Sequence, residues 1–133
     1  MAGLSDFAEN EMLDHLFGAA TYTPPANLYF ALFTAAPSDA GGGTEVSTGS
    51  YARVAVTNNA TNFPAASGGA KSNGTAITFP TASGSWGTVV AVGIFDASTS
   101  GNLIAWATLA VSKAIGSGDT ASFPIGDIDL TVD

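Results

Sequence analysis

The sequence contains no cysteine, a single histidine and only three cationic residues, and each shortage excludes a class of function. Without cysteine, the chain forms neither disulfide bonds nor thiolate metal sites. Arg53, Lys71 and Lys113 stand against 11 acidic residues, so the net charge is −8. Nucleic acids and anionic membrane surfaces are bound through cationic patches, so the sequence disfavours both as partners.

Side chains suited to catalysis are equally scarce. His15 is the sole histidine, and no serine is framed by a nucleophile motif. Asp127 and Asp129 share one face of an expected strand, about 7 Å apart. Such a pair could hold a cation or take part in glycoside hydrolysis, but a solvated sheet face is the simpler interpretation. We therefore predict a non-enzymatic protein with no metal or cofactor site.

A second candidate metal site lies at residues 96–101, where side-chain oxygens are spaced as at the start of a calcium-binding loop. Such a loop needs a glutamate at its twelfth position, where this chain has Ala107. We interpret the segment as a hairpin tip instead. Its predicted exposed residues are Asp96, Ser98, Ser100 and Asn102.

The residues that are abundant favour a β-rich fold. Hydrophobic residues make up 46% of the chain, charged residues only 11%, and 16 residues are glycine. A length of 133 residues is typical of one domain, so we expect a single domain over residues 1–133. The first residues lack a basic leader, and no apolar run reaches about 18 residues, so we expect neither a signal peptide nor a membrane span.

One short helix is predicted near the N-terminus, over residues 6–17. Ser5 is a good N-cap, and Gly18 stands where a left-handed C-cap is common. A helix of this length is marginal alone, so it must dock on its own sheet or on a neighbouring subunit. Its apolar stripe is the predicted partner-docking surface and consists of Phe7, Met12, Leu13, Leu16 and Phe17.

The remainder alternates short apolar segments with polar turns. Residues 27–34 are apolar on both faces, which predicts a strand buried on both sides. Residues 87–95 and 103–111 predict a β-hairpin, followed by a polar turn at residues 112–119. A polar loop is expected at residues 35–49. Further strands are expected at residues 51–57, 75–79, 120–124 and 127–132, with a short one near Asn62 and Phe63. The pattern predicts an antiparallel β-sandwich or small barrel with one short N-terminal α-helix.

An ordered set of short segments spans nearly the whole chain. They are LSDFAEN at residues 4–10, LYFALFT at 28–34, YAR at 51–53, ITFPTA at 77–82, WGTV at 86–89, VGIFD at 92–96 and GNLIA at 101–105. Together they resemble small virion proteins of tailed bacteriophages that are usually labelled phage tail fibre proteins. The resemblance implies a structural role in the virion and carries no known active site.

Three roles agree with this resemblance. The chain has no coiled coil or long repeat of the kind that builds a trimeric shaft. An acidic domain with one docking helix therefore favours a capsid decoration (cement) protein on the major capsid lattice. A tail or tail-fibre component is the first alternative, and a host-glycan-binding module that uses Trp86 or Trp106 is the second.

The expected partners are other virion proteins, namely the major capsid protein or a tail protein. We also expect a homo-oligomer, with a trimer as one candidate. The expected location is the virion, after synthesis in the host bacterial cytoplasm.

Overall fold

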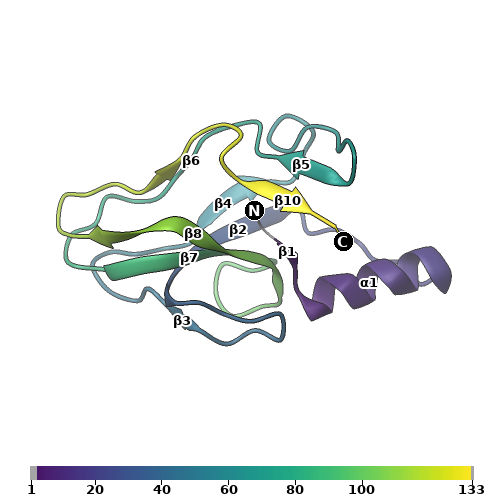
Figure 1. Ribbon diagram of the computed structural model, residues 1–133, viewed down its shortest axis with the longest axis horizontal. Helices are drawn as coiled ribbons and strands as arrows, with labels where there is room; N and C mark the ends of the chain where they lie inside the picture. The colour runs from purple at the N-terminus through teal and green to yellow at the C-terminus, as the bar shows by residue number, and fades with distance from the viewer. Residues whose placement is uncertain (1–2, 133) are drawn as a thin grey trace.

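The structure is a computed structural model that describes residues 3–132. Its main feature is an open antiparallel sheet in which β2 (Asn27–Ala35) is the central strand (Figure 1). The strands of this sheet are β1 (Gly3–Leu4), β8 (Leu103–Ile115), β7 (Gly87–Phe95), β2, β3 (Thr44–Glu45) and β4 (Val54–Thr57). The order is β1-β8-β7-β2-β3, and β4 pairs with the first half of β2.

β2 is buried on both faces, as its continuous apolar sequence predicts. Phe30 and Leu32 point into the main core, whereas Ala31 and Phe33 point to the opposite face of the sheet. All four are at most 2% exposed. The strand is also paired along both edges, with β7 on one side and with β4 and β3 on the other.

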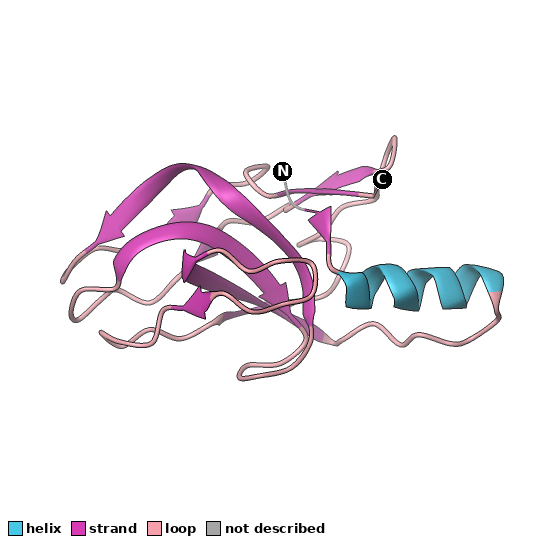
Figure 2. Ribbon diagram, turned by 60° about the horizontal axis from the view of Figure 1, so that its bottom comes forward, coloured by secondary structure: helices cyan, strands magenta, loops and turns pink. Residues whose placement is uncertain are grey.

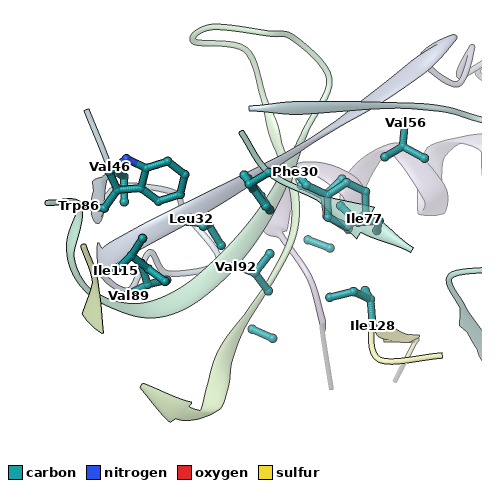
Figure 3. Packing of buried hydrophobic residues seen from close by; sticks show 14 of the residues in the cluster. Phe30, Leu32, Val46, Val56, Ile77, Trp86, Val89, Val92, Ile115 and Ile128 are labelled. Atoms are coloured by element: carbon teal, nitrogen blue, oxygen red, sulfur yellow. The ribbon is translucent and has the colours of Figure 1, made fainter. Parts of the chain in front are cut away.

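A second layer covers the inner face of the sheet. It consists of two short ladders, in which β5 (Ala70–Ser72) pairs with β10 (Asp129–Thr131) and β6 (Ile77–Thr78) pairs with β9 (Ser122–Phe123). The core between the layers includes Phe30, Leu32, Val46, Val56, Ile77, Trp86, Val89, Val92, Ile115 and Ile128 (Figure 3). The predicted fold class is confirmed, because residues 3–132 are mainly β, antiparallel and sandwich-like, and this part of the chain has one helix and no closed barrel.

The outer face of the sheet has a smaller apolar cluster of its own. The rings of Phe33 and Phe95 stack with their centroids 6.1 Å apart. Gly93 makes room for this stack, since a Cβ at that position would lie 2.8 Å from Cε2 of Phe33. The loops that follow β2 and β7 lie on this side of the sheet (Figure 1).

The β7–β8 hairpin is longer than predicted. Ala91 pairs with Thr108 and Val89 pairs with Lys113, so four residues of β8 bulge opposite Val90 alone. Beyond the bulge β8 continues to Ile115, which is 9% exposed. The predicted turn at residues 112–119 is therefore wrong over its first half, because a wide bulge lets polar residues remain within a strand.

Three other local predictions need correction. The loop at residues 35–49 contains β3 and the buried Val46. No strand forms near Phe63, because the Asn59 side chain accepts the Asn62 N–H at 2.9 Å and closes a turn. The left-handed residue after the helix is Ala19 (φ 56°), whereas Gly18 has φ −156°.

The helix α1 (Asp6–Phe17) has the predicted bounds. Ser5 caps it, since its hydroxyl oxygen accepts the Ala8 N–H at 3.3 Å. Within residues 3–132, no helix is both long and apolar enough to cross a bilayer.

Phe79→Ala tests the core. Phe79 is 2% exposed, and its ring packs against Tyr51 and Phe123 with centroids 6.3 Å away in each case. We expect the free energy of unfolding to fall by about 3–5 kcal/mol, because a large cavity would remain. Urea denaturation measures the loss. The control Ile125→Ala, at a position 68% exposed, should stay within about 0.5 kcal/mol of the wild type. Equal losses in the two variants would contradict the assigned core.

Candidate functional site

The helix α1 projects from one end of the molecule, beyond both layers of strands (Figure 2). None of its residues is buried. Its root is nevertheless held firmly by Ser5, which is 1% exposed. The Ser5 hydroxyl donates to the carbonyl oxygen of Leu103, and the Ser5 N–H donates to that of Ile104 at 2.8 Å. The helix therefore starts from a fixed point on β8.

The chain returns from the tip of α1 alongside the helix (Figure 2). The N–H of Tyr22 donates to Nδ1 of His15 at 3.3 Å, and the Tyr22 ring meets Phe7 edge-on at 6.4 Å. Burial raises the pKa of Tyr22, and the nearby carboxylates of Asp96 and Glu11 raise it further. Residues 6–26 thus form a supported projection, which we call the arm.

The structure divides the five predicted docking residues into two groups. Leu13, Leu16 and Phe17 are 54%, 62% and 81% exposed, so the outer half of the arm presents a cluster of large apolar side chains to solvent. Phe7 and Met12 are half-buried. Phe7 faces Tyr22, and Met12 lines a shallow hollow between the arm and the end of β10.

The arm is also acidic. Asp6, Glu9, Glu11 and Asp14 lie on α1, which contains no lysine or arginine. A helix that presents exposed apolar side chains next to carboxylates is suited to an apolar groove that carries a cation on its rim. The docking role of α1 remains a prediction.

The hairpin tip lies near the root of the arm and is rigidly held. Ser98, Ser100 and Asn102 are exposed, whereas Asp96 is half-buried. The Asp96 carboxylate accepts the Asn102 backbone N–H at 2.7 Å and its side-chain amide at 2.9 Å. Arg53 donates from Nη1 to the carbonyl oxygens of Ala97 and Ser100, both at 2.8 Å.

Arg53 is the structural residue that sequence reasoning missed. It forms a bidentate ion pair with Glu45, at 2.8 Å from Nη2 and 2.9 Å from Nε, and its side chain is 7% exposed. Its guanidinium lies 3.8 Å from the centre of the Phe95 ring. No local signal in the sequence marks this role, because the partners of Arg53 lie 8, 44 and 47 positions away in the chain.

Tyr51 connects this ion pair to the core. Its hydroxyl donates to Oε2 of Glu45 at 2.6 Å and accepts the Leu32 N–H at 3.0 Å. Its ring packs edge-on against Trp86 at 5.3 Å. Burial, followed by the hydrogen bond to Glu45, raises the pKa of Tyr51 far above its ordinary value.

The remaining candidate residues form no catalytic arrangement. Asp127 and Asp129 are exposed, and Asp129 accepts a hydrogen bond from the Ser72 hydroxyl at 2.5 Å. Between residues 3 and 132, no group of three or more His, Cys, Asp or Glu side chains is placed to hold a metal ion. Trp86 is 3% exposed and donates its indole N–H to the Gly49 carbonyl oxygen, so its ring is a core element. Trp106 is half-buried, and its indole N–H donates to Asp39 at 2.9 Å.

Comparison of the sequence with known protein families identifies the family to which the chain belongs. The family model described as podophage GP4 fiber I protein gp80 matches residues 3–131. The chain belongs to this family. Membership in the fiber I family confirms the resemblance to phage tail fibre proteins, and it indicates a structural component of a bacteriophage virion. A search of curated proteins found no similar sequence.

Arg53→Met tests the ion pair at the hairpin tip. This substitution leaves Glu45 without its cation and releases two carbonyl oxygens at the tip. We expect a loss of about 1–3 kcal/mol in the free energy of unfolding, because the half-buried Glu45 carboxylate is left without its partner. Hydrogen exchange of residues 96–102 should also accelerate. The control Lys113→Met removes an exposed cation, and a comparable loss there would refute the assignment.

Alkaline titration tests Tyr51. Its raised pKa in the folded state means that the stabilising contribution is present below about pH 10, the ordinary tyrosine value, and is lost as the pH rises further. We expect the urea midpoint to fall more steeply above this pH in the wild type than in Tyr51→Phe. Parallel curves for the two proteins would show that Tyr51 is not the group responsible.

Proposed function

We propose that this protein is a structural subunit of a phage fibre and that the arm attaches it within the virion. The observation that carries the proposal is the apolar cluster of Leu13, Leu16 and Phe17 on a helix that buries none of its own residues. The assignment to a fibre is supported by the family, which is described as a fiber I protein. As a phage protein, it is expected to be made in the host bacterial cytoplasm and then incorporated into the particle.

The energetics of the arm support an attachment role. Large apolar side chains gathered on a projecting surface typically mark an interaction site. A helix of twelve residues is marginal in water alone, yet this one is capped by Ser5 and braced by its return segment. A preorganised helix loses little conformational freedom on docking, which favours binding. The arm therefore suits insertion into a groove on a neighbouring protein.

A capsid decoration protein would use the same arm to bind the major capsid lattice. The family description favours a fibre role over this capsid role. The glycan-binding alternative is weakened, because Trp86 is enclosed in the core and Trp106 is bound to Asp39. Trp106 alone would be a small platform for a sugar ring.

Localisation on purified particles tests the fibre role. We expect an antibody against this chain to label the tail region in electron micrographs, and we expect isolated tails to retain the protein. Label spread over the capsid shell would support decoration and overturn the fibre assignment.

Substitution in the arm tests the mode of attachment. A phage lacking the gene is complemented with Leu16→Asp/Phe17→Asp, which alters two exposed side chains and should leave folding intact. We expect this variant to be folded but absent from particles, because two carboxylates on the apolar cluster would prevent docking. The matched control Ile125→Asp changes an exposed apolar residue away from the arm and should be incorporated normally. Normal incorporation of the arm variant would eliminate the arm as the attachment element.

A further inference from the structure

Asn73 has a side chain whose hydrogen-bonding groups are all used inside the molecule. It follows β5 directly and is 2% exposed. Its carboxamide oxygen accepts the Ile128 N–H at 2.9 Å, and its amide nitrogen donates to the carbonyl oxygens of Thr75 and Pro124, at 2.8 and 2.9 Å. A side-chain amide offers an oxygen acceptor and two N–H donors, so each has a partner here. We call this set of contacts the Asn73 clasp.

The Asn73 clasp joins the two short ladders of the second layer. Backbone bonds reinforce it, since the Asn73 N–H donates to the Ile128 carbonyl oxygen at 3.2 Å and the Gly126 N–H donates to that of Asn73 at 3.0 Å. These partners lie in residues 124–128, the connection from β9 to β10. This connection buries only one side chain, that of Ile128. Its position therefore depends largely on the polar contacts of the clasp.

Asn73 is also followed by Gly74, and this is the one Asn–Gly pair in the sequence. Deamidation of an asparagine begins when the backbone nitrogen of the next residue attacks the carbonyl carbon of the side chain. Ammonia leaves and a cyclic succinimide forms, which water then opens to aspartate or isoaspartate. A glycine at the next position makes this attack easiest, because it has no Cβ and its backbone turns freely. Asn73 is therefore the asparagine of this chain whose local sequence is most reactive.

The closed clasp prevents this reaction. The attacking nitrogen would be that of Gly74, and its N–H donates to the carbonyl oxygen of Asn62 at 2.6 Å. Gly74 has no freedom to turn, since even a Cβ on it would collide with the Thr61 carbonyl oxygen and the Pro64 ring. The amide that would leave as ammonia is fixed by its two acceptors. The reaction therefore needs the clasp to open.

The product of the reaction does not fit the closed clasp. Deamidation exchanges the two N–H donors for a carboxylate oxygen, which would face the carbonyl oxygens of Thr75 and Pro124 without an N–H between them. A buried charge that lacks a partner is costly. Isoaspartate also lengthens the main chain by a carbon atom, which displaces the backbone groups that bond Gly126 and Ile128. A modified clasp therefore stays open.

We propose that Asn73 is a latent deamidation site, at which opening of the clasp becomes a permanent loss of the tie between β5 and the β9–β10 connection. Such opening requires little of the fold to separate, because β5 pairs with β10 over three residues and β6 with β9 over two. The frequency of opening therefore sets the rate of modification. For a subunit that is not replaced once a particle has assembled, the clasp limits the working lifetime. The proposal does not depend on where in the particle the protein lies.

Ageing of the purified full-length protein tests the protection. Samples are kept in mildly alkaline buffer with and without denaturing urea, trypsin then releases residues 72–113, and fragmentation in a mass spectrometer assigns the modified residue. We expect deamidation at Asn73 to be at least about tenfold slower in the folded sample, because only the open form reacts. Equal rates overturn the proposal. In urea, Gly74→Ala should slow the reaction severalfold, and an unchanged rate would show that Gly74 is not the attacking residue.

A matched pair of core variants separates opening of the clasp from unfolding of the whole domain. Ile128→Val loosens the packing at the clasp, whereas Val46→Ala loosens the core beside β3. Both changes are small enough for the protein to fold, and Val46→Ala should cost at least as much stability in urea denaturation. We expect Ile128→Val to accelerate deamidation of the folded protein more than Val46→Ala does. No acceleration, or acceleration that follows overall stability alone, would overturn the role of the clasp.

Asn73→Asp imitates the aspartate product. We expect its urea midpoint to fall, and the amide hydrogens of Gly126 and Ile128 to exchange at least about tenfold faster than in the wild type. The matched control is Asn59→Asp, because the Asn59 side-chain oxygen accepts two backbone N–H groups and aspartate keeps that oxygen. This control should retain the wild-type midpoint. An Asn73→Asp protein with the midpoint and the exchange rates of the wild type contradicts a clasp that stays open after modification.

Discussion

The partly buried Arg53–Glu45 ion pair is the interaction on which the arrangement of the outer sheet face depends. Arg53 uses three nitrogen atoms to hold the Glu45 carboxylate on β3 and two carbonyl oxygens of the hairpin tip. Tyr51 extends the network to β2 through the Leu32 N–H. A buried charge is costly unless it is paired and hydrogen-bonded, so each contact limits the positions available to the others. Segments that are distant in sequence are thereby held in one geometry.

The position of this network explains why the loops are ordered. The tip at residues 96–102 and the segment around β3 have few apolar side chains of their own, so the hydrophobic effect alone would hold them weakly. Directional hydrogen bonds to a planar guanidinium supply the missing constraint. The Phe33–Phe95 stack below the guanidinium excludes water from one side and strengthens those bonds. The start of the arm is also held in place by this region, since the Asp6 N–H donates to the Asp39 carbonyl oxygen in the adjoining loop, at 3.0 Å.

The sequence allowed the strongly patterned elements to be predicted. α1, β2 and the β7–β8 hairpin were found because capping, continuous apolar character and turn composition are local signals. Three strands of the short ladders, β6, β9 and β10, lie within their predicted ranges but are shorter, since two or three residues of strand carry almost no periodicity from which to set their ends. β5 was missed because Ala70–Ser72 resembles the polar loop around it and is a strand only by virtue of β10. The extension of β8 was missed because its bulge contains polar residues.

The candidate site was predictable only in part. The exposed apolar face of α1 was visible as a stripe in the sequence, but the inward position of Phe7 depends on the return of Tyr22. The hollow lined by Leu109, Val111 and Phe123 could not have been predicted, because it lies where the bulge of β8 stands beside β9, a two-residue strand that pairs with β6 far earlier in the chain. The contacts of Arg53 join residues 8, 44 and 47 positions apart in the chain. Such contacts leave no mark on local sequence pattern.

The attachment of the arm at both of its ends has a mechanical consequence. Residue 5 leads from β1, which is paired to β8, and residue 27 leads directly into the central strand β2. Tension applied to the end of the arm at residue 26 would enter the sheet along the central strand β2, which begins on the side of the arm (Figure 1). The hydrogen bonds that join β2 to β4 and β7 would then be loaded together in shear, whereas β1 is held to β8 by only two residue pairs and would separate first.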